Sequence, residues 1–273
     1  MRRMFAITGT LVSLLLLIPF PGVSAASSFA SPPFQVVWQR GEAAFPNFWG
    51  PLPLAKDGMQ EPYKEAPGGQ RLVQYFDKAR MELTNPSTPT VVTNGLLTVE
   101  LKTGKVQLGD NTFEQRPPAR INIAGDPGSD SLTYADLAQL PERDTERSLP
   151  DLQPPRAFVN GQIVATPELL VPGLPSGPGL LYGPYVQDPG KRYGQYVFKP
   201  FSDFINLIPQ GQAAIGYPIS PAIVAPVKVG GVSSYVLVQA FERRVLTFNL
   251  LNPPNSRLEF GNIGQHYNRW RYA

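Results

Sequence analysis

"LVQYFDKARMEL" (Leu72–Leu83) is nearly repeated far downstream as "LVQAFERRVLTF" (Leu237–Phe248). Aligning Gln74 with Gln239 matches a Val-Gln-x-Phe-acid-base pattern in both places. In the first copy polar and apolar residues alternate, and β-branched and aromatic side chains dominate, which is typical of a strand. The acid-base pair marks a tight connection into a second alternating run, so the stretch predicts a β-hairpin.

The alternation also predicts which side chains the first hairpin buries. Met81 and Leu83 are expected to face the core, whereas Arg80 and Glu82 are expected to face water. The second copy breaks this alternation after its turn, and we expect its strand to be covered on both faces.

Four further features flank the two copies in the same order. They are "WGPLP" (49–53) and "IGYPI" (215–219), the glycine pairs at 68–69 and 230–231, the Asn-Pro turns at 85–86 and 252–253, and the closing "TNGLL" and "GNIG". We interpret this order as an internal duplication in which Phe76 corresponds to Phe241. The expected fold class is α+β and β-rich, with two divergent repeats built on antiparallel strand pairs and a few short helices.

These landmarks divide the chain into four parts. They are a signal peptide at 1–25, a first repeat module at 26–125, a Pro/Gly-rich connecting segment with a short helix at 126–180, and a second repeat module at 181–273. "LLTVEL" and "KVQLG" are expected to pair through a Thr103-Gly104 turn, and "AFVNGQIVA" to turn at Asn160-Gly161. Helices are expected at Ser131–Leu140 and in "PFSDFINLI" (200–208), whose apolar face should pack on a sheet.

The N-terminal segment is typical of a secretory signal peptide. Arg2 and Arg3 precede an apolar stretch that ends at Phe20, and Val23 and Ala25 supply small residues for cleavage. The apolar run is shorter than the roughly 20 residues that a membrane-spanning helix needs. The sequence therefore predicts export, by the general secretory or the twin-arginine route, and no membrane span after cleavage.

Composition narrows the chemistry. The 24 basic residues, two of them in the predicted signal peptide, nearly balance the 21 acidic residues, so we expect no nucleic-acid partner. The absence of cysteine excludes disulfides, thiol nucleophiles and thiolate metal sites, and the single histidine, His266, excludes multi-histidine metal sites. We expect no cofactor and no metal, and a structural hydrogen-bonding role for His266.

Carboxylates are the remaining route to catalysis. Asp77 and Glu242 occupy matching positions, so a pseudo-twofold arrangement could bring them together. Each is followed by a basic residue, however, and we interpret both as turn residues with local ion pairs. Glu82, Glu100 and Glu114 leave a glycosidase pair formally open. An extracellular hydrolase, glycosidase or peptidase, that uses a carboxylate pair is therefore the alternative function.

Two resemblances point to the cell envelope. The segment from Ile215 to about Gly264 resembles the LGFP repeats of bacterial envelope proteins in its "IGYPIS", its "VQAFERR" strand and its closing "GNIG", although it has Gly-Tyr-Pro where that family has Gly-Phe-Pro. Most of the mature chain is similar to a set of uncharacterised secreted bacterial proteins with the patterns "APGGQRLVQYFDKARMELTNP" and "GQHYNRWRY". The resemblance implies association with the cell wall or surface, and it brings no catalytic residues.

Aromatic side chains give the best ligand hypothesis, because aromatic faces suit the apolar C–H faces of sugar rings. The candidate ligand-binding residues are Tyr217, His266, Tyr267, Asn268, Trp270 and Arg271. Alternation in the C-terminal tail predicts a terminal strand with one wet face, packed on the second repeat, with Trp270 substantially buried.

These observations predict a secreted, non-catalytic binding or scaffolding protein of the cell envelope. The expected partner is a cell-wall glycan or another surface polymer. A deep cleft with two carboxylates would favour the hydrolase, and a shallow aromatic face would favour the binding protein.

Overall fold

The computed structural model describes residues 29–50, 53–54, 57–85, 87–88, 91–140, 156–165, 182–191, 194–249 and 251–273. The predicted signal peptide lies outside these ranges. No helix among the described residues is long and apolar enough to cross a membrane. The fold is α+β and rich in antiparallel strands, as the sequence predicts.

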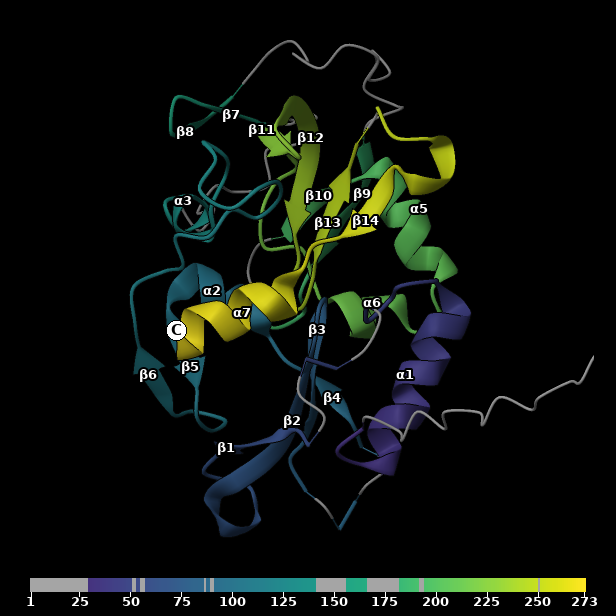
Figure 1. Cartoon of the computed structure of the whole chain (residues 1–273), viewed down its shortest axis with the longest axis vertical. Coiled ribbons are helices and arrows are strands. Elements are labelled where there is room, and N and C mark those ends of the chain that lie inside the picture. Colours follow the sequence, from purple (N-terminus) through teal and green to yellow (C-terminus); the bar gives the residue numbers. More distant parts are fainter. Residues whose placement is uncertain are drawn as a thin grey trace, which may run out of the picture.

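The first unit contains one antiparallel sheet between two helices. Its elements are α1 (Pro32–Ala44), β1 (Met59–Pro62), the 3-10 turn η1 (Pro67–Gly69), β2 (Gln70–Phe76), β3 (Ala79–Leu83), β4 (Thr93–Asn94) and α2 (Leu97–Thr103). The strands pair in the order β1-β2-β3-β4. This sheet occupies the lower part of Figure 1, with α1 along one side. The β2–β3 hairpin is the one that the sequence predicts.

The second unit also runs from a helix through four strands to a last helix, but it has an additional short helix and its 3-10 turn precedes the fourth strand. It contains α5 (Lys199–Leu207), α6 (Gly211–Ile215), β11 (Ile223–Val229), β12 (Val232–Ala240), β13 (Val245–Phe248), the 3-10 turn η2 (Pro254–Ser256), β14 (Leu258–Phe260) and α7 (Ile263–Tyr272). Its four strands pair consecutively within a six-stranded sheet of order β14-β13-β12-β11-β7-β8. The helix α5 lies within one residue of its predicted bounds and buries the predicted face.

Smaller elements connect and extend the two units. They are β5 (Lys105–Gln107), β6 (Phe113–Gln115), α3 (Tyr134–Ala138), β7 (Arg156–Val159), β8 (Gln162–Ala165), β9 (Tyr182–Gln187) and β10 (Gly194–Phe198). β7 joins β11 in parallel, and the β7–β8 hairpin turns at Asn160-Gly161 as predicted. Both turn residues have positive φ, 49° and 78°, which is the requirement of a type I′ turn.

The two hairpins pair in the same register. Gln74 lies opposite Met81 in the first, and Gln239 lies opposite Leu246 in the second. Both glutamines are fully buried. The side-chain oxygen of Gln74 accepts from the backbone N–H of Ala30 just before α1, and that of Gln239 accepts from the N–H that directly precedes α5. The recurring glutamine therefore fixes a helix entry in each unit.

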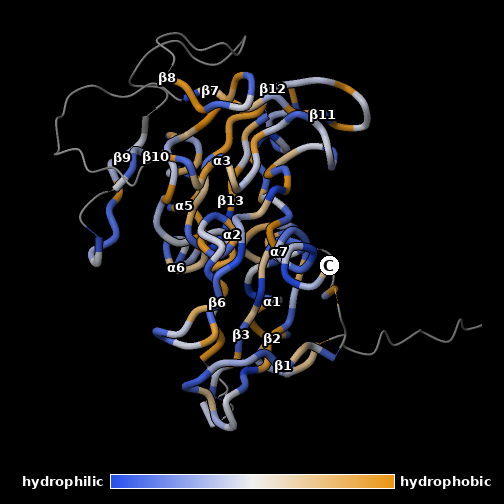
Figure 2. The backbone as a smooth tube through the Cα atoms, turned by 90° about the vertical axis from the view of Figure 1, so that its left-hand side faces the viewer, coloured by the Kyte–Doolittle hydropathy of each residue, from blue (hydrophilic) through white to orange (hydrophobic). Residues whose placement is uncertain are grey.

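Two apolar cores each draw on both units. Phe76 and Phe241 lie in one core, together with residues of α1 and α5, and are 0% and 1% exposed. Each also forms an isolated bridge, to Pro53 and Pro218 respectively. The second core lies on the opposite faces of β2 and β12 and includes residues of α2, α3 and α7. The strand β12 is therefore covered on both faces, as predicted. Figure 2 shows hydrophobic residues along the chain in the middle of the molecule.

One predicted hairpin is wrong, because "LLTVEL" begins a helix and not a strand. Leu97 and Leu101, four residues apart, are both fully buried, which is the helical spacing that alternation over this short run concealed. Gly104 ends α2 in the left-handed conformation with φ 74°, a common helix terminus. The predicted Thr103-Gly104 hairpin turn is thus a helix C-cap. The helix α3 is shorter than predicted and is capped by Thr133, not by Ser131.

The C-terminal helices of the two units cross over to the opposite unit. The N-terminal turn of α7 docks on the first hairpin, where the N–H groups of Gly264 and Gln265 donate to the carbonyl of Asp77 at 3.0 and 3.2 Å. Correspondingly, the N–H of Val99 in α2 donates to the carbonyl of Glu242 at 3.4 Å. The acidic position of the recurring motif thus receives the helix of the other unit in both cases.

The basic position of the motif makes a matching contact. Lys78 Nζ donates to the carbonyl of Phe260, at the end of β14, at 2.7 Å. Arg243 Nη1 donates to the carbonyl of Asn94, at the end of β4. Each cation therefore reaches the fourth strand of the other unit. The predicted local ion pairs at these turns are therefore wrong, because Lys78 and Arg243 bind carbonyls of the other unit.

Candidate ligand-binding cleft

Six charged side chains lie buried together on one face of the first sheet. This ion cluster consists of Glu61, Arg71, Arg80, Glu82, Glu100 and Arg271, each at most 9% exposed. The expectation that Arg80 and Glu82 face water is therefore wrong. The cluster holds equal numbers of positive and negative charges, so each buried charge is stabilised by an opposite charge in place of water.

Arg80 is the central member of the ion cluster. Its Nε donates to Glu82 Oε1 at 2.8 Å, and its Nη2 donates to Glu100 Oε1 at 3.1 Å. Its Nη1 lies 3.4 Å from Glu61 Oε2. Arg271 Nη1 donates to the same Glu61 oxygen at 2.9 Å, which ties α7 to β1.

Tyrosine hydroxyls complete the cluster. Tyr75 and Tyr272 donate to Glu61 Oε1 at 2.5 and 2.7 Å, and Tyr267 donates to Glu100. The rings of Tyr75 and Tyr267 stack with centroids 5.9 Å apart. The hydroxyls therefore satisfy carboxylate oxygens that the guanidinium groups leave open.

The electrostatics identify the cluster as structural. Burial pushes the pKa of Glu61 up, but the guanidinium groups of Arg80 and Arg271 and two tyrosine hydrogen bonds outweigh burial and hold that pKa below its usual value. Glu82 and Glu100 are likewise paired with Arg80. The carboxylates of Glu82 and Glu100 are therefore not free to contact a ligand, as the glycosidase alternative would require.

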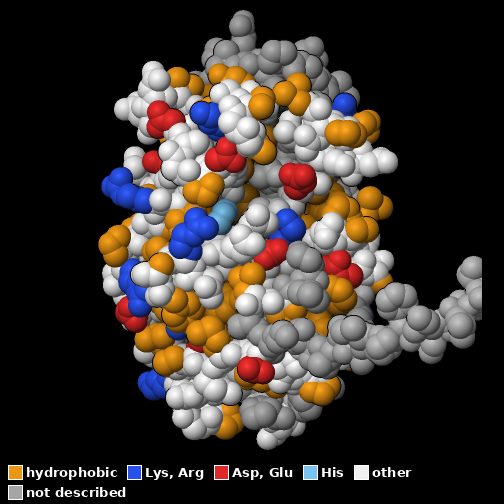
Figure 3. All heavy atoms as spheres, viewed as in Figure 1, with side chains coloured by type: hydrophobic (Ala, Val, Ile, Leu, Met, Phe, Trp, Pro, Cys, Tyr) orange, Lys and Arg blue, Asp and Glu red, His pale blue; other side chains and the backbone are white. Residues whose placement is uncertain are grey.

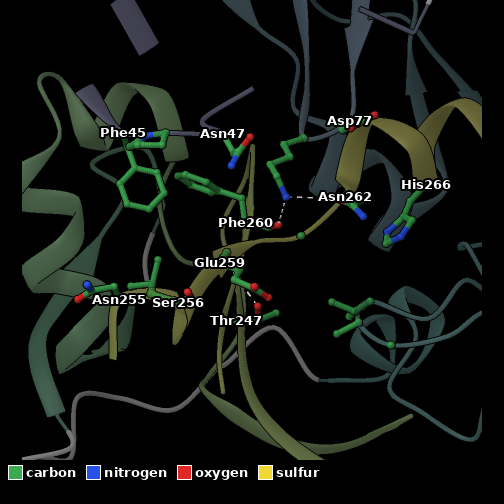
Figure 4. Close-up of a pocket in the computed structure, with 17 residues that line it drawn as sticks. Phe45, Asn47, Asp77, Thr247, Asn255, Ser256, Glu259, Phe260, Asn262 and His266 are labelled. Atoms are coloured by element: carbon green, nitrogen blue, oxygen red, sulfur yellow. Dashed lines mark hydrogen bonds between the residues drawn. The ribbon is translucent and has the colours of Figure 1, made fainter. Parts of the chain in front are cut away.

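A cleft of about 700 Å³ opens between the two units. Figure 3 shows this face, with the single histidine at its middle, and Figure 4 shows the lining side chains. Five segments contribute: the chain after α1, the turn between β2 and β3, the loop at 123–125, the segment from β13 to β14, and the first turn of α7. The lining residues are Phe45, Pro46, Asn47, Asp77, Lys78, Ile123, Ala124, Gly125, Thr247, Asn255, Ser256, Leu258, Glu259, Phe260, Gly261, Asn262 and His266.

Lys78 lies between the walls of the cleft. Beyond its bond to Phe260, its Nζ donates to Asn262 Oδ1 at 3.1 Å, and Figure 4 marks both contacts. Burial lowers the pKa of Lys78, nearby Arg244 adds to the effect, and Glu259 opposes it. Asp77 beside it accepts a 2.7 Å hydrogen bond from Gln265 Nε2 through Oδ1. The cation and one carboxylate of the cleft are thus held by α7 and by the residues just before it.

His266 presents a fixed donor to the cleft. Its Nδ1 lies 2.9 Å from the hydroxyl of Tyr134, the structural hydrogen bond that the sequence predicts. Tyr134 is fully buried, and among the described residues its hydroxyl has no other hydrogen-bond partner, so we assign its O–H as donor to Nδ1. Burial, then Arg269 and Lys78, lower the pKa of His266 to about 4. The neutral ring therefore carries its proton on Nε2.

Of the six residues predicted to bind a ligand, only His266 lines the cleft. Tyr267 and Arg271 belong to the buried ion cluster and its tyrosines. Tyr217 is half-buried, and its backbone N–H donates to Glu242 Oε2 at 3.0 Å. Asn268 is half-buried and lies outside the cleft lining. The structure thus separates residues that the sequence groups together.

The predicted terminal strand is also wrong. The tail forms the helix α7, and it packs against α2, β2 and β3 of the first unit, not on the second repeat. Trp270 is half-buried, and its Nε1 donates to the carbonyl of Pro117 at 3.1 Å. Tyr267 and Arg271, four residues apart, bury one helix face, a spacing that the alternating aromatic and basic residues obscured.

Sequence reasoning missed most of the cleft. Asp77 and Lys78 were available as the acid-base pair of the recurring motif, and Asn262 as part of "GNIG". Phe45, Thr247 and the segment 255–259 carry no distinguishing signal, because only the crossing of the units brings them together.

Within the described ranges, no group of three or more His, Cys, Asp or Glu side chains is arranged to hold a metal ion. Comparison of the chain with models of known protein families, with curated proteins and with solved structures finds no match.

Proposed function

We propose that the protein is a secreted, non-catalytic binding or scaffolding protein of the cell envelope, and that its cleft binds a neutral segment of a cell-wall glycan or surface polymer. The predicted signal peptide and the resemblance to envelope repeats support this location. The chemistry of the cleft supports this ligand class.

The mixed lining of the cleft is the observation that carries the proposal. Its lining combines amide and hydroxyl side chains with apolar ones such as Phe45 and Ile123. A sugar ring offers the same mixture, since hydroxyls surround apolar C–H faces. The ionisable groups Asp77, Lys78 and Glu259 leave the lining with little net charge, which disfavours a highly anionic polymer.

A hydrolase is the second candidate, because the cleft is lined by two carboxylates, Asp77 and Glu259. Asp77 is engaged by Gln265 through its side chain and by α7 through its backbone. Such a carboxylate is built into the contact between the units, which favours binding over catalysis.

Sedimentation of the mature protein with purified cell walls tests the proposal, with soluble sugar release assayed in the same tubes. We expect saturable retention without release of products, and competition by neutral oligosaccharides but not by anionic ones. Absence of retention would refute the binding proposal, and release of products would favour the hydrolase.

The cleft is tested by filling it. Ser256 is exposed and lines the cleft, so Ser256→Trp should lower retention at least ten-fold without unfolding the protein. Ser87→Trp, at an exposed serine outside the cleft, is the matched control and should bind like wild type. Equal retention of both variants would place the ligand elsewhere.

A further inference from the structure

We propose that the tips of the β7–β8 and β11–β12 hairpins, none of whose residues line the cleft, form a contact site for a lipid bilayer. The two hairpins lie side by side, because β7 runs parallel to β11 with Ala157 opposite Val224. Their turns therefore lie toward the same end of the sheet, in the upper part of Figure 1.

The tips expose valine where a hairpin turn ordinarily exposes polar residues. Val229 and Val232 flank Gly230-Gly231 and are 58% and 69% exposed, and Val159 on the neighbouring hairpin is 40% exposed. A side chain added at Gly161, Gly230 or Gly231 would meet nothing within 4 Å, so these turns project away from the protein. Exposed apolar groups gathered at one end mark an interaction site.

The β11–β12 tip is hydrogen-bonded to Asp126 in this exposed position. Both oxygens of the Asp126 carboxylate accept hydrogen bonds from the tip, one from the N–H of Gly230 and one from the N–H of Gly231, at 3.2 Å each. The N–H of Asp126 donates back to the carbonyl of Lys228 at 2.6 Å. These hydrogen bonds join the tip to the loop that carries Asp126, and the negative charge of Asp126 is turned toward backbone donors.

The charged and aromatic residues of the hairpins fit a bilayer surface. Neither hairpin contains an acidic residue, whereas each contains a basic one, Arg156 and Lys228. Lys228 is exposed at the base of the apolar tip, and Tyr235, 49% exposed, lies further down the same hairpin. An apolar tip, then a cation, then a tyrosine is the order in which acyl chains, lipid phosphates and the headgroup boundary follow one another.

Flotation of the whole mature protein with phosphatidylcholine vesicles, with and without phosphatidylglycerol, tests the proposal. We expect weak, reversible binding that is several-fold stronger on the anionic vesicles. Val229→Ser combined with Val232→Ser should reduce the bound fraction at least five-fold, and Lys228→Gln should remove the preference for anionic lipid. Leu207→Ser, which alters a more exposed residue on α5, is the matched control and should bind like wild type.

Thermal unfolding and cell-wall sedimentation of the same variants distinguish a loss of lipid binding from unfolding and from a loss of ligand binding in the cleft. Both should be unchanged in the double serine variant, because Val229 and Val232 are exposed and belong neither to the two cores nor to the cleft lining. Failure of wild type to float with vesicles, or equal flotation of the double variant, would overturn the lipid proposal and leave the proposed cleft function intact. Sedimentation velocity tests whether a second copy of the chain occupies the tip instead. If wild type self-associates and the double variant is monomeric, the tip is a contact between copies and the lipid proposal is overturned.

Discussion

The backbone N–H of Gly264 donates a 3.0 Å hydrogen bond to the carbonyl oxygen of Asp77, so that the last helix of the chain rests on the first hairpin. A Cβ atom at Gly264 would lie 1.8 Å from the carbonyl oxygen of Phe76. Because that neighbour is backbone, the helix must move. Gly264→Ala is therefore expected to destabilise the protein by about 2–3 kcal/mol, measured by denaturant unfolding.

Gly190→Ala is the matched control for this substitution. The nearest atom to a Cβ at Gly190 is an oxygen of Asp188 at 3.5 Å, an ordinary contact. Its effect is expected to stay within about 0.5 kcal/mol. Similar stability of the two variants would show that α7 does not approach the hairpin so closely.

Removing the centre of the ion cluster should be costly at neutral pH. Arg80→Met leaves Glu61, Glu82 and Glu100 with buried charge that Arg71 and Arg271 only partly balance, and we expect a loss of about 3–5 kcal/mol. Lys199→Met, which removes an exposed pair with Asp203, should cost less than about 0.5 kcal/mol.

The loss in Arg80→Met should depend on pH. In wild type the pKa of Glu61 is below its usual value, so its contribution to stability is present above about pH 4.5 and is lost as the pH falls through the folded pKa. Without Arg80 that pKa rises, and protonation relieves the buried charge. Chemical unfolding from pH 7 to pH 4 should therefore bring the variant closer to wild type; a constant difference would contradict this.

His266 should make wild-type stability fall between pH 6.5 and pH 4. Its pKa is about 4 in the folded protein, below the ordinary 6.5, so the unfolded chain binds the additional proton in this window. At 1.36 kcal/mol per pKa unit the loss is at most about 3 kcal/mol, and less because the ring is partly exposed. Since it is the only histidine, His266→Asn should flatten the curve of unfolding free energy against pH. An unchanged slope in the variant would assign the effect to other groups.

The two phenylalanines of the recurring motif should matter equally. Phe76 and Phe241 lie in the same core and form corresponding bridges, so Phe76→Ala and Phe241→Ala are each expected to cost about 3–5 kcal/mol. Urea titration of both variants measures the two losses. A large loss for one and a negligible loss for the other would refute their equivalence.

A chain that ends at Gly264 should lose stability although only its tail is missing. The deletion removes Tyr267 and Arg271 from the ion cluster, and Glu61 and Glu100 then lose partners. We expect Tm to fall by roughly 10 °C or more. Removal of Ala273 alone, an exposed terminal residue, should leave Tm unchanged. An unchanged Tm in the longer deletion would make the tail an appendage.

Local patterns in the sequence predicted the elements whose signals are local. Alternation with a polar turn located the β2–β3 hairpin, and Asn160-Gly161 located the β7–β8 turn. The same rule failed for Arg80, because charge at alternate positions indicates a wet face unless opposite charges from distant segments cover it. Glu82 is a local partner of Arg80, but Glu61 of β1, Glu100 of α2 and the C-terminal Arg271 lie outside any local window.

Local sequence patterns could not predict the cleft either, because its residues come from distant segments. His266 was visible as the single histidine, but its partner Tyr134 comes from a separate helix. The walls formed by Asn47 and by Glu259 meet only because each unit gives its last helix to the other. The aromatic tail drew attention to the right segment, α7, but its most buried residues hold the fold together and do not face the cleft.

The crossing of α2 and α7 has a consequence for how the chain acquires its structure during synthesis. Glu61 and Arg271 are 210 residues apart, and the contact between them cannot form until the last residues have been delivered. Until then the Arg271 guanidinium is missing from the charged face of the first hairpin, and water must solvate Glu61 in its place. Such long-range closure slows folding and leaves early segments exposed. The charged face of the first hairpin therefore acquires its buried partners only after α7 has been synthesised.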